Sequence, residues 1–139
     1  MKKTKTLLSL SFILLLFISS NSSATPLSFS GKEVTLDFKT NIEEVLKNKK
    51  ELSFLLIADF TNEELKAWEK QVKSDENVKQ IKLSKASNNK GWDVVLILKN
   101  EINRSNAKML FSFSLKTDYI IIGNEKMLFN VFVSKHVPN

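Results

Sequence analysis

The stretch from Leu52 to Leu98 constrains the fold of this 139-residue chain more than any other part of its sequence. It holds an apolar run (Leu52–Phe60), a polar segment whose apolar residues have helical spacing (Thr61–Asn77), and two further apolar runs separated by a turn. This pattern predicts a strand, a helix, a strand and a strand, in that order. The rest of the chain is expected to pack against these four elements.

The helix inside this stretch carries the clearest local signals of the sequence. Thr61 and Glu64 have the spacing of a capping box, and Phe60 and Leu65 stand at the two positions of a hydrophobic staple. The spacing of the residues that follow predicts one buried face and one exposed basic face. The buried face comprises Leu65, Trp68 and Val72, and the exposed face comprises Lys66, Lys70 and Lys73.

Before this stretch, the sequence predicts one strand and one short helix. Apolar and polar residues alternate through Glu33–Phe38, which is typical of a half-buried strand. Thr40 and Glu43 have the spacing of a second capping box, so we expect a helix over about residues 41–50. Lysines in its last turn, Lys47, Lys49 and Lys50, would meet the negative end of the helix dipole.

After the stretch, the alternation of apolar and polar residues predicts three more strands. Asn100–Asn106 is expected to be a polar loop, and Lys108–Lys116 a strand with Met109, Phe111, Phe113 and Leu115 facing inward. Tyr119–Ile122 and Met127–Val133 are expected to form a closing hairpin around a turn at Gly123.

These elements together predict an α+β domain with two layers, in which two helices cover one face of a mostly antiparallel sheet. The order is β-α-β-α-β followed by an antiparallel meander. The connections Lys39–Glu51 and Thr61–Asn77 are both long enough for parallel crossovers. The other face of the sheet is expected to be partly solvated and to carry Ser112, Ser114, Lys116, Thr35 and Asp37.

The first 24 residues have the pattern of a signal peptide. Met1–Lys5 is basic, Leu7–Ile18 is apolar, and small residues lead up to Ala24, so cleavage is predicted between Ala24 and Thr25. The mature chain, residues 25–139, is then one domain in the periplasm or the medium. The alternative is a leader that stays as an anchor, although its apolar run is shorter than the roughly 20 residues that span a bilayer.

Composition argues against several kinds of chemistry. The chain has no cysteine, which excludes disulfides and thiol catalysis, and its single histidine, His136, cannot build a histidine zinc site or a Ser-His-Asp triad. Its three glycines are isolated, so no phosphate-binding loop is present. Three of the 21 basic residues lie in the leader, leaving 18 against 15 acidic ones, and this mild charge does not favour nucleic acid. We therefore predict no cofactor, no metal and no enzymatic activity.

Several residues remain as candidates for contact with a partner. Trp92 follows a turn, and the basic face of the helix (Lys66, Lys70 and Lys73) is a further candidate. Tyr119 and Phe132 lie in the predicted final hairpin, whose edge is expected to accept an added strand from a partner. Asp59, at the end of a predicted strand, is the best-placed single carboxylate, with a structural role at the start of the helix as the alternative.

These observations favour an exported, non-catalytic binding protein of the bacterial cell envelope. The order of elements in Leu52–Leu98 is similar to half of a ferredoxin-like periplasmic domain of pilus and secretion machinery, which implies an accessory role in such an assembly. One alternative is an inhibitor or immunity protein that blocks a toxin or lytic enzyme, and another is an exported effector that uses Asp59. The expected partners are envelope or secreted proteins, without nucleic acid and without stable membrane insertion after cleavage of the leader.

Overall fold

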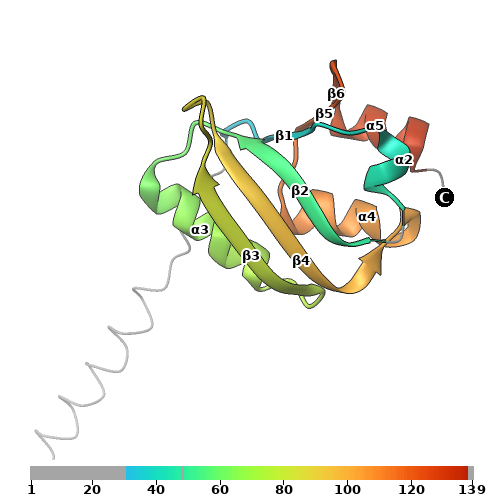
Figure 1. Ribbon diagram of the computed structural model, residues 1–139, viewed down its shortest axis with the longest axis horizontal. Coiled ribbons are helices and arrows are strands. Elements are labelled where there is room, and N and C mark those ends of the chain that lie inside the picture. Colours follow the sequence, from blue (N-terminus) through green and yellow to red (C-terminus); the bar gives the residue numbers. More distant parts are fainter. Residues whose placement is uncertain (1–30, 48, 138–139) are drawn as a thin grey trace, which may run out of the picture.

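The computed structural model describes residues 31–47 and 49–137, and the predicted leader with its cleavage site lies outside them. Six strands form one sheet in the order β3-β4-β2-β1-β5-β6 (Figure 1). All neighbouring strands are antiparallel except β1 and β5, which are parallel. The strands are β1 (Thr35–Phe38), β2 (Lys49–Ile57), β3 (Val78–Lys85), β4 (Trp92–Ile102), β5 (Tyr119–Ile122) and β6 (Glu125–Leu128).

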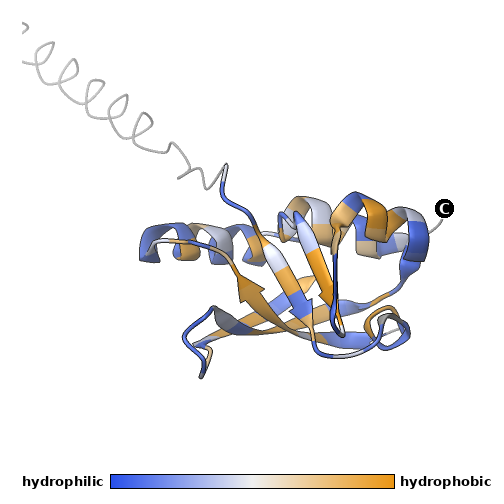
Figure 2. Ribbon diagram, turned by 90° about the horizontal axis from the view of Figure 1, so that it is seen from above, coloured by the Kyte–Doolittle hydropathy of each residue, from blue (hydrophilic) through white to orange (hydrophobic). Residues whose placement is uncertain are grey.

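The longer helices lie on one side of this sheet, as Figure 2 shows. They are α3 (Asn62–Lys73), α4 (Arg104–Met109), which continues directly into the π-helical segment η1 (Leu110–Ser114), and α5 (Phe129–His136). A single turn, α2 (Ile42–Val45), connects β1 to β2. Within the described residues no helix covers the other face of the sheet (Figures 1 and 2). The two-layer α+β sandwich predicted from the sequence is therefore the architecture of the protein.

The core lies between the helix layer and the inner face of the sheet. Trp68 of α3 is fully buried, and its indole Nε1 donates a hydrogen bond to the backbone oxygen of Leu115 at 2.9 Å. Phe111 of η1 is also fully buried. Its ring centroid lies 6.0–6.3 Å from the rings of Phe38, Phe129 and Phe132, which come from β1 and α5. Aromatic packing of this kind joins the C-terminal helices to the sheet.

The central part of the chain folds as its sequence predicts. The capping box is present, because the Thr61 side chain accepts from the Glu64 backbone while the Glu64 side chain accepts from the Thr61 N–H. Trp68 and Val72 are buried on the inner face of α3. Gly91, in the predicted turn between β3 and β4, has a φ of +155°, and a Cβ there would meet the Leu56 backbone oxygen at 2.2 Å. This turn therefore requires glycine.

The predicted route from β1 to β2 is wrong in two respects. The helix spans Ile42–Val45 only, and its first turn is capped by Asn41, whose Oδ1 accepts from the Glu44 N–H at 2.9 Å, instead of by Thr40. β2 already begins at Lys49, and it runs antiparallel to β1 instead of following a parallel crossover. The second crossover is as expected: β2 and β3 run in the same direction, with β4 between them.

The prediction of a strand over Lys108–Lys116 is wrong, because this segment is helical. Asn103, in the predicted polar loop, caps α4 through a capping box with Asn106. The buried side chains follow a helical period and do not alternate: Ala107, Leu110, Phe111, Ser114 and Leu115. Ser112, Ser114 and Lys116 therefore do not lie on the open face of the sheet, and Thr35, which does, is buried.

The end of the predicted hairpin is also wrong. β5 and β6 pair around the turn at Gly123 as expected, but β6 ends at Leu128 and α5 begins at Phe129. Phe132 is consequently a core residue with no exposed surface, instead of a residue on a sheet edge.

Candidate partner-binding surface

The structure separates the residues that the sequence singled out for partner contact. Trp92 begins β4, is half-buried and packs against the core beside Leu56 and Lys85 in register. Phe132 is buried in α5 and is not available to a partner in this fold. The lysines Lys66, Lys70 and Lys73 are exposed on α3, and Lys73 forms an ion pair with Glu69 at 2.6 Å.

Tyr119 lies on β5, on the face of the sheet opposite the helix layer. The ammonium nitrogen of Lys126, on the neighbouring strand β6, lies 4.2 Å from the centre of its ring. The same ammonium is 2.9 Å from Glu33 Oε1, and this contact lowers the pKa of Glu33 below its usual range. Tyr119 therefore lies at one side of this face among paired charges.

Asp59 is exposed in the connection between β2 and α3, where the neighbouring contacts are structural. Lys32 Nζ donates to the backbone oxygen of Asp59 and to Glu64 Oε2, both at 2.7 Å. The Lys32 ammonium, together with the backbone N–H of Thr61, lowers the pKa of Glu64. Lys32 thus links the segment that precedes β1 to the capping box of α3. Among the described residues no cluster of three or more His, Asp or Glu could hold a metal ion.

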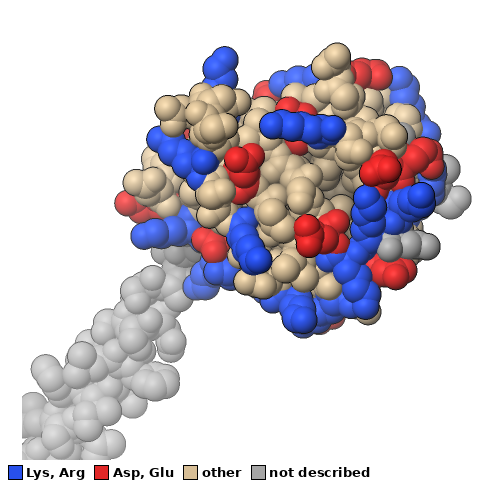
Figure 3. Space-filling model, viewed as in Figure 1, with Lys and Arg blue, Asp and Glu red and all other residues tan. Residues whose placement is uncertain are grey.

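The open face of the sheet is a surface that no helix of the described residues covers. Figure 3 looks onto this face and shows uncharged residues in its middle with lysines and carboxylates around them. Strand register places Val95 and Ile97 of β4 beside Ser53 and Glu51 of β2. Leu55 and Ile57 continue the same face, followed by Tyr119 and Ile121 of β5 across β1. Most of these apolar side chains are half-buried, and Leu55 is buried.

A shallow hollow of about 190 Å³ lies at the middle of the open face. Leu55 and Val95 contribute apolar surface to it, whereas Asp37 and Asp93 contribute carboxylates. Lys39 lines it from the end of β1. The hollow therefore offers an apolar surface beside charges of both signs.

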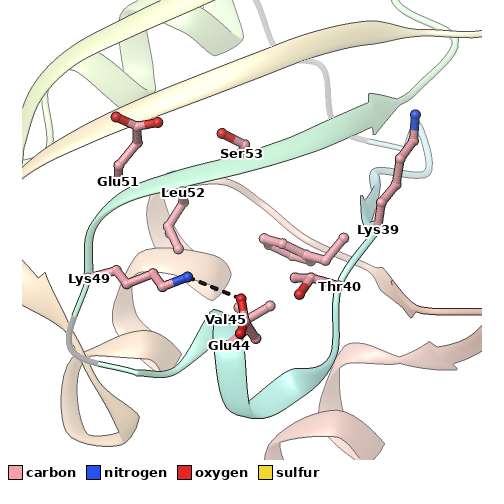
Figure 4. Close-up of a pocket in the computed structure, with 9 residues that line it drawn as sticks. Lys39, Thr40, Glu44, Val45, Lys49, Glu51, Leu52 and Ser53 are labelled. Atoms are coloured by element: carbon pink, nitrogen blue, oxygen red, sulfur yellow. Dashed lines mark hydrogen bonds and ion pairs between the residues drawn. The ribbon is translucent and has the colours of Figure 1, made fainter.

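A second hollow, of about 420 Å³, adjoins the first, because Lys39 and Ser53 line both. It lies between α2 and the first half of β2 (Figure 4). Figure 4 shows Glu51 and Ser53 on one side of β2 and Leu52 on the other, with Glu44 and Lys49 below the strand. The ion pair between Lys49 Nζ and Glu44 Oε2 is 3.3 Å long.

We call the two hollows together the open-face groove. Carboxylates and ammonium groups line it together with apolar side chains, which matches a polypeptide segment that carries apolar and charged side chains. The chain offers no cysteine and no histidine near this groove to act as nucleophile or base. The sequence does not reveal this groove, because β2 carries apolar residues on both faces, a pattern typical of a strand that is covered on both sides.

Comparison of this chain with protein-family models, with curated proteins and with solved structures gives no match. None of the helices in the described residues has the length and apolar character needed to cross a bilayer.

Proposed function

We propose that this protein is a non-catalytic binding protein of the bacterial cell envelope that takes a protein partner on its open-face groove. The first 24 residues support export, since their basic, apolar and small-residue segments have the order of a signal peptide. An accessory role in a secretion or pilus assembly is the setting that we favour, with inhibition of a toxin or lytic enzyme as the alternative.

One observation carries this proposal: the open face of the sheet is apolar at its centre and no described helix covers it. Val95, Ile97 and Ile57 are half-buried there by their neighbours on the sheet alone. Apolar side chains gathered on one face and rimmed by charges mark interaction sites in soluble proteins. A partner on this face would complete the burial of these side chains.

The edges of the sheet are less suited to binding a partner than its open face is. β6 is one edge, but it has only four residues before α5 begins. β3 is the other edge, and it carries the exposed lysines Lys79, Lys82 and Lys85, which discourage pairing with another strand. Strand addition, which the sequence suggested at the final hairpin, is therefore a weaker proposal than docking on the face.

Site-specific photocrosslinking in the native host tests the proposal. A photoreactive amino acid replaces the exposed Ser53, which lines both hollows, and a matched control carries it at Lys66 on the exposed face of α3. We expect a discrete adduct with an envelope protein from position 53 only. Ser53→Arg, which fills the groove without touching the core, should abolish complex formation, whereas Lys66→Glu should leave it unchanged.

The identity of the captured protein separates the two settings. A component of a secretion or pilus assembly supports the accessory role, whereas a lytic enzyme whose inhibition is lost in Ser53→Arg supports the inhibitor. The proposal is wrong if position 53 gives no adduct while the variant remains folded, or if positions 53 and 66 capture the same proteins equally.

A further inference from the structure

The helix layer carries a second surface whose composition differs from that of the open-face groove. Among the described residues, the large apolar side chains with the greatest exposure are Met109 and Phe113 on this layer, each 60% exposed, and Leu128, which lies on β6 beside Tyr119. Met109 and Phe113 are four residues apart on the continuous helix α4–η1, so they lie on the same side of it. Two large apolar side chains on the same side of a helix form a small exposed apolar patch.

The charged side chains within the segment that carries this pair are all basic. The Asp75 carboxylate, which follows α3, contacts the segment at the buried Ser114. From Ile102 to Thr117 the sequence contains Arg104, Lys108 and Lys116 but no aspartate or glutamate. Arg104 forms an ion pair with Glu43, whereas no ion pair of the described residues includes Lys108 or Lys116. Five residues of this segment, the last of which lies beyond the end of η1, are called the Met109–Phe113 patch: Lys108, Met109, Ser112, Phe113 and Lys116. The patch is apolar at its middle and basic at its ends.

The backbone beneath the patch is held firmly by α3. Gln71 Nε2 donates to the backbone oxygens of Phe113, at 2.8 Å, and Ser114, at 3.3 Å. Trp68 Nε1 donates to the oxygen of Leu115. These are carbonyl groups at the end of a helix, which have no partner within the helix itself. Side chains of α3 thus fix the position from which Phe113 projects.

We infer that the Met109–Phe113 patch docks the protein onto the surface of an anionic phospholipid bilayer. Helix surfaces that combine apolar side chains with lysines rest in the interface of such a bilayer, with the apolar groups among the acyl chains and the ammonium groups at the phosphates. The absence of acidic residues between Ile102 and Thr117 makes the charge of the segment complementary to that surface. Two projecting side chains provide less area than a stable protein–protein interface buries. A bilayer surface, in contrast, does not need a shape complementary to the protein.

This docking would leave the open-face groove accessible. The helix layer lies on one side of the sheet and the groove on the other (Figure 2). A protein resting on a membrane through α4–η1 would therefore present the groove away from the bilayer. The inference does not depend on the proposed function, because each surface is tested by residues that the other does not contain.

A fluorescent reporter on the patch tests the inference with the full chain. The chain has no cysteine, so Ser112→Cys provides a single attachment point for an environment-sensitive dye. Ser84→Cys, exposed on the open face of β3, is the matched control. The dye reports its own surroundings, so an apolar leader retained on the chain does not by itself alter the signal at either position. With vesicles rich in phosphatidylglycerol, we expect a blue shift and quenching by brominated lipid at position 112 and not at position 84.

Variants in the reporter background separate the two contributions. Met109→Ser with Phe113→Ser should weaken binding about tenfold or more, and Lys108→Glu with Lys116→Glu should abolish the preference for phosphatidylglycerol over phosphatidylcholine. All four substitutions are at exposed positions, and circular dichroism verifies that the variants fold. The inference is wrong if the dye at position 112 does not respond to vesicles, or responds as it does at position 84. It is also wrong if the signal appears only with an envelope protein extract or with rising protein concentration, which would indicate a protein partner or self-association.

Discussion

The block from β2 to β4 and the C-terminal segment from Asn103 to Val137 reach the same helix-on-sheet architecture in different ways. In the first block, the capping box of Thr61 and Glu64, the helical spacing of Trp68 and Val72 and the turn at Gly91 all favour the structure that forms. In the C-terminal segment, sequences rich in phenylalanine and valine form η1 and α5, although such residues favour strands.

The difference shows that the secondary structure of the C-terminal segment is determined by burial, whereas that of the β2–β4 block is determined by local preference. Phe111 and Phe132 are fully buried in helices, and Leu115 is fully buried just after η1. The contact between Phe111 and Phe38 exists only when β1 is in place. The C-terminal helices are therefore products of tertiary packing. Four experiments test this comparison, and the one with the largest expected effect removes the centre of that packing.

Phe111→Ala should destabilise the protein by about 3–5 kcal/mol, because it leaves a cavity where the rings of three other phenylalanines meet. Urea unfolding followed by circular dichroism measures the loss. The matched control is Phe113→Ala, two residues further on but exposed, which should change the free energy of unfolding by less than about 0.5 kcal/mol. If the two substitutions had equal effects, the phenylalanine cluster would not be what stabilises the C-terminal segment.

Trp68→Phe tests the contact through which the two regions meet. It removes the Nε1 donor, leaves the Leu115 carbonyl without its partner and should cost about 1–3 kcal/mol in the free energy of unfolding. Native-state hydrogen exchange should show the largest loss of protection at amides of residues 110–117. Lys66→Ala, on the exposed side of the same helix, serves as the control and should leave both measurements unchanged.

The two capping boxes allow a direct comparison between the regions. Thr61→Ala and Asn103→Ala each remove a side chain that accepts hydrogen bonds from the first turn of a helix, and each should cost about 1 kcal/mol. Thermal unfolding of both variants is measured beside Asn62→Ala, which lies at an exposed first helical position. A loss for Thr61→Ala alone would show that the cap at Asn103 is unimportant and that packing by itself positions α4.

Lowering the pH should have the smallest effect on stability, and this effect acts through Glu64 in the β2–β4 block. Lys32 lowers the pKa of Glu64 in the folded protein, so the ion pair stabilises the fold at pH values above the unfolded pKa of about 4.3. That contribution is lost as the pH falls through the lower, folded value. Glu64→Gln should flatten the acid side of the stability profile slightly, whereas Glu63→Gln, an exposed neighbour, should leave it unchanged.

The same contrast explains which parts of the fold could be predicted from the sequence. α3 is specified locally by Thr61, Glu64 and the spacing of its apolar residues. The sequence therefore predicts its position and its buried face correctly. Met109, Phe111, Phe113 and Leu115 alternate as in a strand, yet Ala107, Leu110, Phe111 and Leu115 fit a helical period equally well, so the pattern alone does not distinguish the two. Asn103 and Asn106 marked the start of that helix, although a capping box with asparagine at its third position is a weaker signal than one with glutamate.

The candidate surfaces were harder to predict than the elements. The exposure of the α3 lysines was predicted correctly, because a helical period fixes which residues face outward. Phe132 and Trp92 turned out to pack in or against the core, since the sequence alone does not reveal which element covers an apolar residue. The open-face groove depends on the neighbours of β2 in the sheet, and strand order is a property of the whole fold.

The parallel pair of β1 and β5 has a consequence for the order in which the protein can fold. The Val34 N–H donates to Asp118 Oδ2 across a separation of 84 residues, and β1 lies between β2 and β5 within the sheet. A chain that emerges with its N-terminus first, from a ribosome or a translocase, offers β1 long before β5 exists. Until Tyr119–Leu128 arrives, one edge of β1 stays unpaired and open to aggregation, and only β5 and β6 complete the sheet.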